Sequence, residues 1–228
     1  RVESVTDQLL SILKDSGLKT VTLAPESTWN LRRVVNKSLT DEDIFAAVEK
    51  IFQHDLNVKL YFMVGLPTET DKDILELVNL IRTLQKKAPR YSSLRVSVNP
   101  FIPKPHTPFQ WHHFNYKEIK NKISSLNKEF RSRYFKAESP RSSLIQYVLS
   151  VGGVEIGVVL ERSLQHKLSL PDWQKLSPHW DLESDLPWKN IHVGVSDEFL
   201  KSEYERAMNG DFTPWCETFG CQNCGACP

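Results

Sequence analysis

The residues Leu60-Tyr-Phe-Met-Val-Gly-Leu-Pro-Thr-Glu-Thr70 say most about how this chain folds. Their apolar, β-rich first half predicts a buried strand, and the Gly-Leu-Pro sequence after it predicts a turn. A helical pattern then begins at Asp71. In α/β proteins, a turn that leads from a strand into a helix lies at the carboxyl edge of the sheet, where ligands bind.

The alternation of strand and helix extends over the amino-terminal part of the chain. The predicted order is helix 4–17, strand 19–23, helix 40–52, strand 58–64, helix 71–84 and strand 94–98. Consecutive strands joined by helices need crossover connections and therefore form a parallel sheet. Because three strands are too few to close a barrel, we expect an α/β fold that corresponds to the second half of an α/β barrel.

The carboxyl half of the chain is expected to be mainly helical. Residues 116–137 have the pattern of a basic amphipathic helix, and further helical patterns follow at 141–150, 154–165 and 197–208. A stretch rich in Trp and Pro, residues 171–193, separates the last of them from the others. We therefore divide the chain into a partial barrel (1–112), a helical carboxyl-terminal region (113–210) and a Cys-rich terminus (211–228).

The composition limits the partners that can be expected. The chain has 228 residues, with 29 Lys and Arg against 28 Asp and Glu and a formal net charge of +1. This balance gives no electrostatic reason to expect nucleic acid or an anionic membrane as a partner. The basic side chains of segment 116–137 could contact RNA phosphates. Because acidic residues are interspersed among them, a solvated helix face is the favoured interpretation. No apolar run approaches the roughly 20 residues of a membrane-spanning helix, and no signal peptide is recognisable. The clustering of the four cysteines near the carboxyl terminus, unlike a disulfide framework, leads us to expect a reducing cytoplasm.

Charged residues near the first predicted strand are candidates for ligand binding. Glu26, with Ser27 next to it, follows that strand closely. Its carboxylate could accept hydrogen bonds from ribose hydroxyls or an amino group, or it could simply favour the start of a helix. Arg32, Arg33 and Lys37 come soon afterwards and could hold a carboxylate, although a solvated helix face is the ordinary explanation.

The ends of the second and third predicted strands carry further candidates. Gly65 permits close approach of the backbone, Pro67 fixes the turn, and Glu69 lies near the start of the next helix. An ordinary loop with a favourable charge would look the same. The Pro-rich loop after the third strand is stiff because its prolines restrict the backbone. It would hold Phe101 and Ile102 at the mouth of the sheet as an apolar wall for adenine, or serve as a rigid connector between two domains.

All four cysteines lie near the carboxyl terminus, at Cys216, Cys221, Cys224 and Cys227. A disulfide framework would scatter cysteines to join distant elements, whereas the spacing C-x4-C-x2-C-x2-C suits ligands that converge on one soft metal. Thiolates at such spacing serve both zinc and iron–sulfur centres. The sequence therefore predicts a metal site and leaves open whether it holds zinc or a [4Fe–4S] cluster.

Four motifs together resemble the carboxyl half of a radical S-adenosylmethionine (SAM) domain. They are Ala24-Pro-Glu-Ser27, Asn36-Lys37-Ser-Leu-Thr-Asp-Glu-Asp43, Phe62-Met-Val-Gly-Leu-Pro-Thr-Glu-Thr70 and Phe101-Ile-Pro-Lys-Pro-His-Thr-Pro108. The chain is similar to a group of radical SAM proteins that often carry an amino-terminal cobalamin-binding-like domain. That group shares the Lys-Pro-His-Thr-Pro-Phe-Gln-Trp stretch, a Leu-Pro-Trp…Gly-Val-Ser segment and a terminal cysteine cluster.

The resemblance implies a set of SAM-binding residues at the matching positions. They are Glu26, Ser27, Lys37, Met63, Gly65, Pro67, Glu69, Phe101 and Ile102. Glu26 would contact the ribose or the amino group of SAM, and Lys37 would approach its carboxylate. The strand that contains Met63 would support the adenine, and Phe101 and Ile102 would flank the purine.

The same resemblance implies the function of the intact protein. In radical SAM enzymes a [4Fe–4S] cluster reduces SAM to methionine and a 5′-deoxyadenosyl radical. The C-x3-C-x2-C motif that binds this cluster is absent, since no cysteine precedes Cys216. We therefore expect the chain to be the carboxyl-terminal portion of such an enzyme, inactive without its amino-terminal part, with an unknown substrate and with cobalamin as a possible further cofactor. Two alternatives stay open: a zinc-knuckle α/β binding or scaffold module, and an RNA-modifying enzyme similar to the methylthiotransferases.

Overall fold

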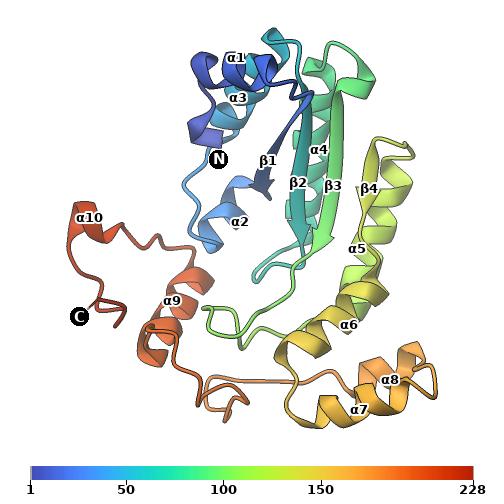
Figure 1. The fold of residues 1–228 in the computed structure, drawn as a ribbon, viewed down its shortest axis with the longest axis vertical. Helices are drawn as coiled ribbons and strands as arrows, with labels where there is room; N and C mark the ends of the chain where they lie inside the picture. Colours follow the sequence, from blue (N-terminus) through green and yellow to red (C-terminus); the bar gives the residue numbers. More distant parts are fainter. Residues whose placement is uncertain (1, 228) are drawn as a thin grey trace.

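The computed structural model describes residues 2–227, and Figure 1 shows a sheet with helices packed on it, followed by a carboxyl-terminal set of helices. The described residues form a sheet of four parallel strands in the order β1-β2-β3-β4. The strands are β1 (Thr20–Glu26), β2 (Asn57–Val64), β3 (Leu94–Pro100) and β4 (Phe135–Ala137). The prediction of an α/β fold with parallel strands, followed by a mainly helical region, is confirmed.

Helices connect the strands and make up most of the carboxyl half. Those up to β4 are η1 (Val2–Ser4), α1 (Asp7–Asp15), α2 (Trp29–Val34), α3 (Asp41–Gln53), α4 (Asp71–Lys87), η2 (Tyr91–Ser93) and α5 (Tyr116–Glu129). After β4 come α6 (Pro140–Val151), α7 (Glu155–Ser163), α8 (Leu170–Lys175), α9 (Asp197–Asn209) and α10 (Cys216–Phe219). Within residues 2–227, no helix combines the length and the apolar character that crossing a membrane requires.

The two faces of the sheet differ because side chains alternate along each strand. On β2, Val58, Leu60 and Phe62 are buried, whereas Lys59 and Tyr61 on the opposite face are partly exposed. The buried face packs against α3, α4 and α5, and together they form the hydrophobic core. In Figure 1, α4 lies behind β2 and β3, and no described helix crosses in front of these strands. We call this uncovered side of the sheet the inner face.

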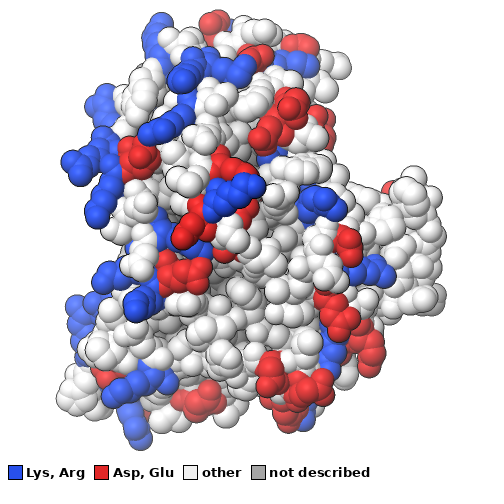
Figure 2. All heavy atoms as spheres, turned by 180° about the vertical axis from the view of Figure 1, so that it is seen from behind, with Lys and Arg blue, Asp and Glu red and all other residues white. Residues whose placement is uncertain are grey.

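The helix-covered side of the molecule carries both signs of charge. Figure 2 shows Lys and Arg side chains interspersed with Asp and Glu side chains over this side. Some of them join neighbouring helices: Lys87 of α4 pairs with Glu49 of α3, and Arg82 of α4 pairs with Glu129 of α5. Exposed pairs of this kind contribute about 0 to 1 kcal/mol each, so the core rather than these pairs holds the helices on the sheet.

The prediction of a single helix over 116–137 is wrong in its carboxyl-terminal part. Helix α5 ends earlier, and β4 then joins the sheet beside β3. The change is favoured because Phe130 and Phe135 are both buried and stack with their ring centroids 4.9 Å apart. A strand of three residues has too little periodicity to be distinguished in sequence from the helix before it.

Candidate functional site

A cavity of about 400 Å³ lies at the carboxyl edge of the sheet, within the volume range of small-molecule sites. Its walls come from the end of β1, the segment after α2, the end of β2 and the Pro-rich loop after β3. The lining residues are Glu26, Val35, Lys37, Met63, Phe101, Ile102, Lys104, Thr107 and Phe109. Five residues that the sequence predicts as SAM-binding are among them: Glu26, Lys37, Met63, Phe101 and Ile102.

The polar end of this cavity is an ion pair between Glu26 and Lys37. The register of β1 with β2 shifts between Leu23 and Glu26, and Glu26 adopts a φ of 70°, which non-glycine residues rarely do. Its Oε1 lies 2.9 Å from Lys37 Nζ, and this ammonium also donates to the carbonyl oxygen of Ala24 at 2.5 Å. The Lys37 and Glu26 side chains are 27% and 24% exposed, so the pair is partly shielded from water. Among residues 2–227, two acceptors are bound to Lys37, which leaves one of its three donors for a ligand.

The rest of the cavity wall is largely apolar. Phe101 and Phe109 meet edge to face with their ring centroids 5.5 Å apart, and Met63 packs in the same cluster. The amide of Phe101 donates to the carbonyl oxygen of Val64 at 2.7 Å, which holds the loop against the end of β2. A flat aromatic ligand could therefore bind along these side chains while the ion pair contacts its polar part.

The turn residues Gly65, Pro67 and Glu69 do not line this cavity. Gly65 has a φ of +83°, and a Cβ added to it would lie 3.0 Å from Ile119 of α5, so glycine is needed for the helix to pack here. The Gly65 amide donates to Glu69 Oε1 at 2.8 Å, and Pro67 is buried in the same turn. In this structure the close approach that Gly65 permits is made to α5.

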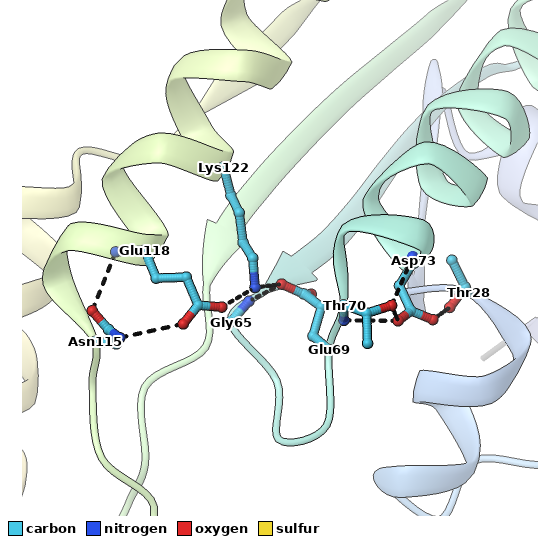
Figure 3. A network of polar contacts seen from close by, with 8 residues as sticks. All are labelled: Thr28, Gly65, Glu69, Thr70, Asp73, Asn115, Glu118 and Lys122. Atoms are coloured by element: carbon cyan, nitrogen blue, oxygen red, sulfur yellow. Dashed lines mark hydrogen bonds and ion pairs between the residues drawn. The ribbon is translucent and has the colours of Figure 1, made fainter.

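Figure 3 shows that the same turn is tied to α5 by a buried ion pair. Glu69 Oε1 lies 2.8 Å from Lys122 Nζ, and the Lys122 and Glu69 side chains are 7% and 1% exposed. Lys122 also pairs with Glu118 on the same helix. The helical pattern predicts a solvated position for Lys122, and this prediction is wrong. The spacing of Glu118 and Lys122 is a sequence signal for an ion pair within the helix, but it gives no indication of Glu69.

Burial and pairing act in opposite directions on this buried pair. Burial raises the pKa of Glu69, because the contacts with Lys122 and the Gly65 amide offset only part of the cost of desolvating the carboxylate. Burial lowers the pKa of Lys122, but hydrogen bonds to Glu118 and Glu69 outweigh it, so the pKa of Lys122 is raised. Lys122 therefore stays charged, and its ion pair with Glu69 holds the turn after β2 against α5.

Two further residues near the cavity are buried inside the protein. The Arg32 side chain is 0% exposed, and its guanidinium donates to the Leu39 carbonyl oxygen and to the Asp41 carboxylate. It therefore belongs to neither a solvated helix face nor the ligand cavity, because the segment after α2 folds back over it. Ser27 is 1% exposed, and its hydroxyl has no hydrogen-bond partner among residues 2–227. Ser27 lies next to Glu26 without lining the cavity.

Two adjacent histidines lie beside the turn, in a cavity of about 310 Å³ that Gly65 and Glu69 also line. Burial lowers the pKa of His112 to about 4, and the neighbouring His113 adds to the effect. Burial also lowers the pKa of His113, whose ring centroid lies 4.6 Å from that of His179. His112 and His113 are therefore both neutral at neutral pH.

The four cysteines do not converge on one point. Cys216, Cys221 and Cys227 are exposed, and Cys224 is partly exposed. Within residues 2–227, no group of three or more His, Cys, Asp or Glu side chains is arranged to hold a metal ion. One local feature suits a metal, since the Asn223 amide donates to Cys221 Sγ at 3.3 Å. The thiolate chemistry thus fits a soft metal, but the described geometry does not.

A separate cavity of about 520 Å³ lies in the carboxyl-terminal half of the chain. It is lined by His106, by Trp111 and by residues between 182 and 201, among them Glu183 and Asp185. The residues that the sequence predicts as SAM-binding all lie elsewhere, so this cavity does not bear on that prediction.

Comparison with known proteins bears on the cavity at the sheet edge. The model of the Radical SAM superfamily matches residues 2–81, a range that includes Glu26, Lys37 and Met63. The chain is also 36% identical over 167 residues to the uncharacterized protein MJ0966 of Methanocaldococcus jannaschii, and the match covers 72% of this chain and 36% of that protein. The chain therefore spans about a third of the length of the curated relative it matches.

Proposed function

Residues 2–81 of this chain belong to the radical SAM superfamily, and from this we propose that the cavity at the sheet edge is part of the SAM-binding site of a radical SAM iron–sulfur enzyme. The observation that supports this most is that five residues, predicted from separate motifs, line one cavity. The whole protein would carry the activity, because the chain spans about a third of its relative.

The cavity residues would share the contacts to SAM. Glu26 would accept hydrogen bonds from the ribose hydroxyls, and Lys37 would hold the Glu26 carboxylate in position while offering its remaining donor. Met63 and Phe101 would enclose the adenine. When bound in its enzymes, SAM supplies a carbon radical that abstracts hydrogen from the substrate. Because no cysteine precedes Cys216, the ligands of the catalytic cluster would come from another part of the whole protein.

Binding of S-adenosylhomocysteine to the chain, measured by isothermal titration calorimetry, tests the site without any iron–sulfur chemistry. We expect Glu26→Gln to weaken binding about tenfold, because a charged hydrogen bond to a ribose hydroxyl would be lost. Phe101→Ala should weaken it by a similar factor through loss of the apolar wall. Glu161→Gln is a matched control, since Glu161 is exposed on α7 and should not affect binding. Equal affinities for the Glu26→Gln and Glu161→Gln proteins would contradict the proposal.

We also expect the chain alone to bind SAM without cleaving it. Anaerobic reconstitution with iron and sulfide, followed by a reductant and SAM, would be analysed for 5′-deoxyadenosine by chromatography. Formation of 5′-deoxyadenosine above a protein-free blank would contradict the idea that this chain supplies only part of the site.

A second proposal concerns the Cys-rich terminus, which we infer to bind a soft metal through Cys216, Cys221, Cys224 and Cys227. It is supported by the spacing of the four cysteines and by the bond from the Asn223 amide to Cys221 Sγ, which would stabilise this sulfur once it is a thiolate. Because the four side chains do not converge in the structure, metal binding would have to draw them together. Metal analysis after reconstitution, with a visible spectrum, would distinguish a coloured iron–sulfur cluster from colourless zinc. We expect the unchanged chain to bind about one metal centre and the Cys221→Ser protein to lose it. If the Cys221→Ser protein keeps the full metal content, Cys221 is not a ligand and the proposed metal site is contradicted.

A further inference from the structure

The inner face of the sheet is polar, which is unusual for parallel strands. Parallel sheets are normally covered on both faces, and their strands are then apolar throughout. Here the inner face carries hydroxyl-bearing and basic side chains: Thr22, Lys59, Tyr61, Arg95, Ser97 and Lys136. A polar face of this kind is suited to contact a polar ligand rather than to form a core.

The strand register brings three cations of this face together. Lys59 pairs with Arg95 across β2 and β3, and Ser97 pairs with Lys136 across β3 and β4. Arg95 and Ser97 are two residues apart on β3 and therefore point to the same face. Neighbouring strands lie about 4.8 Å apart, so Arg95 lies directly beside Lys59 and diagonally next to Lys136, between the strands that carry the two lysines.

The side chain of Lys59 extends along the strand toward the carboxyl edge. Its ammonium donates to the Tyr61 hydroxyl at 2.5 Å and lies 4.5 Å from the centroid of the Tyr61 ring. Tyr61 pairs with Ser97, which in turn pairs with Lys136. The Lys59 ammonium therefore lies at the level of Lys136 on the sheet.

No carboxylate of the described residues balances these three charges. The one polar partner of Lys59 is Tyr61, and neither Arg95 nor Lys136 has an ion pair among residues 2–227. Like charges directly opposite each other destabilise a sheet. Glu26, the carboxylate that lines the neighbouring cavity at the sheet edge, is paired with Lys37. The three cations thus form a positive site that an anion would neutralise.

The positive site leads into the cavity at the sheet edge. Met63 lies two residues beyond Tyr61 on the same face of β2, and it lines that cavity. At about 3.3 Å per residue, the level of Tyr61 and Lys136 lies roughly 7 Å along the strand from Met63, and the level of Arg95 lies roughly 13 Å from it. A ligand held by the cations would therefore reach the cavity with its other end.

We propose that Lys59, Arg95 and Lys136 bind the anionic group, a carboxylate or a phosphate, of the substrate of this enzyme. The Arg95 guanidinium can bind two oxygens of such a group at once, and the two ammonium groups add charge and donors. The hydroxyl of Ser97 lies between Tyr61 and Lys136 and supplies a neutral donor. The role of this site in substrate binding rests on the proposed function, whereas anion binding by the three cations does not.

Anion binding can be measured on the chain itself. Inorganic phosphate and succinate would each be titrated by calorimetry at low ionic strength, where charges are least screened. We expect saturable binding of at least one of them, which also distinguishes a phosphate from a carboxylate site. Arg95→Gln and Lys59→Met should each weaken it about tenfold. Lys120→Gln removes an exposed cation of α5 and should leave the affinity unchanged.

Absence of saturable binding would overturn the proposal, as would equal weakening by Arg95→Gln and Lys120→Gln. Circular dichroism would check that each variant is folded, and Lys136→Gln replaces any variant that is not. The SAM proposal can fail separately, because we expect Glu26→Gln to affect S-adenosylhomocysteine binding alone and Arg95→Gln to affect anion binding alone.

Discussion

Lys122 holds the turn after β2 in place, since Glu69 of that turn has its carboxylate buried against the Lys122 ammonium. Removing one partner of a buried ion pair is costly because the other charge stays buried without compensation. We therefore expect Lys122→Met to lower the free energy of unfolding by about 3 to 5 kcal/mol, as measured by urea denaturation.

Two further variants test whether the effect comes from the pair itself. Lys120→Met changes an exposed lysine on the same helix and should have little effect. Adding Glu69→Gln to Lys122→Met removes the uncompensated charge and should restore part of the lost stability. A loss for Lys122→Met no larger than that for Lys120→Met would show that the pair does not support the turn.

His112 makes the stability of the protein depend on pH. Burial lowers its pKa from 6.5 to about 4. Between these two values the unfolded chain binds a proton that the folded protein does not, so stability decreases as the pH falls through this range. The decrease amounts to at most about 3 kcal/mol, and we expect His112→Gln to remove it.

The comparison needs urea denaturation at about pH 7 and at about pH 4.5, which spans most of this range. The loss of stability on acidification should be smaller for the His112→Gln protein than for the wild type. His166→Gln, at an exposed position, should behave like the wild type. If the wild type and His112→Gln lose the same amount, burial of His112 is not the cause.

The residues of the cavity could be predicted from sequence in part. Glu26 and Phe101 follow strands that are recognisable from their apolar patterns, and parallel strands bring their ends together. Lys122 could not be recognised, because its burial results from the packing of α5 on a turn far away in sequence. Gly65 was recognisable as a special position, but the sequence does not tell whether a ligand or a helix approaches it.

Helix α4 begins with a capping box that connects it to the turn after β2. The Thr70 hydroxyl accepts a hydrogen bond from the Asp73 amide at 3.4 Å, and the Asp73 carboxylate accepts one from the Thr70 amide at 2.8 Å. We expect Thr70→Ala to lower the free energy of unfolding by about 1 kcal/mol, because an amide at the helix start loses its partner. Chemical denaturation measures this loss.

Thr83→Ala, within the same helix, is the matched control for this prediction. Thr83 is exposed, and its hydroxyl donates to the Asn79 carbonyl oxygen at 2.9 Å. Alanine is the better helix former, so this change should leave stability equal or slightly higher. Equal losses for Thr70→Ala and Thr83→Ala would argue against a role for the cap.

Long elements with clear periodicity could be predicted, and short ones could not. Strands β2 and β3 and helices α3 and α4 have apolar patterns long enough to define them. Helix α8 overlaps the Trp- and Pro-rich stretch, for which no helix was predicted. Its signal was nevertheless present, because Ser169 and Asp172 form a capping box and a proline occupies the first turn.

The chain beyond α9 folds back onto α2 and onto the residues directly after it, which include the cavity residue Lys37. Phe212 lies against Trp29, with ring centroids 6.3 Å apart, and Arg33 stacks over the Phe212 ring. The Thr213 hydroxyl donates to Glu203 at 2.6 Å, and its amide donates to Asn36. These contacts join the carboxyl-terminal segment to the segment that carries Lys37.

We expect Thr213→Val to loosen this segment, because the change removes the hydroxyl that binds Glu203. Limited proteolysis with chymotrypsin, which cleaves after aromatic residues such as Phe219, should then proceed faster. Thr218→Val is a matched control, since Thr218 is exposed further along the tail. Equal cleavage rates for the two variants would indicate that the contact of Thr213 does not hold the segment.

The order of the four strands in space is the same as their order in the chain. No strand has to be inserted between two that are already paired, so each can be added to the growing edge as soon as it leaves the ribosome. Domains generally fold as units during synthesis, and contacts between nearby segments form fastest. Among these four strands, β1 would accordingly be available before the others, and β4 would be added after them.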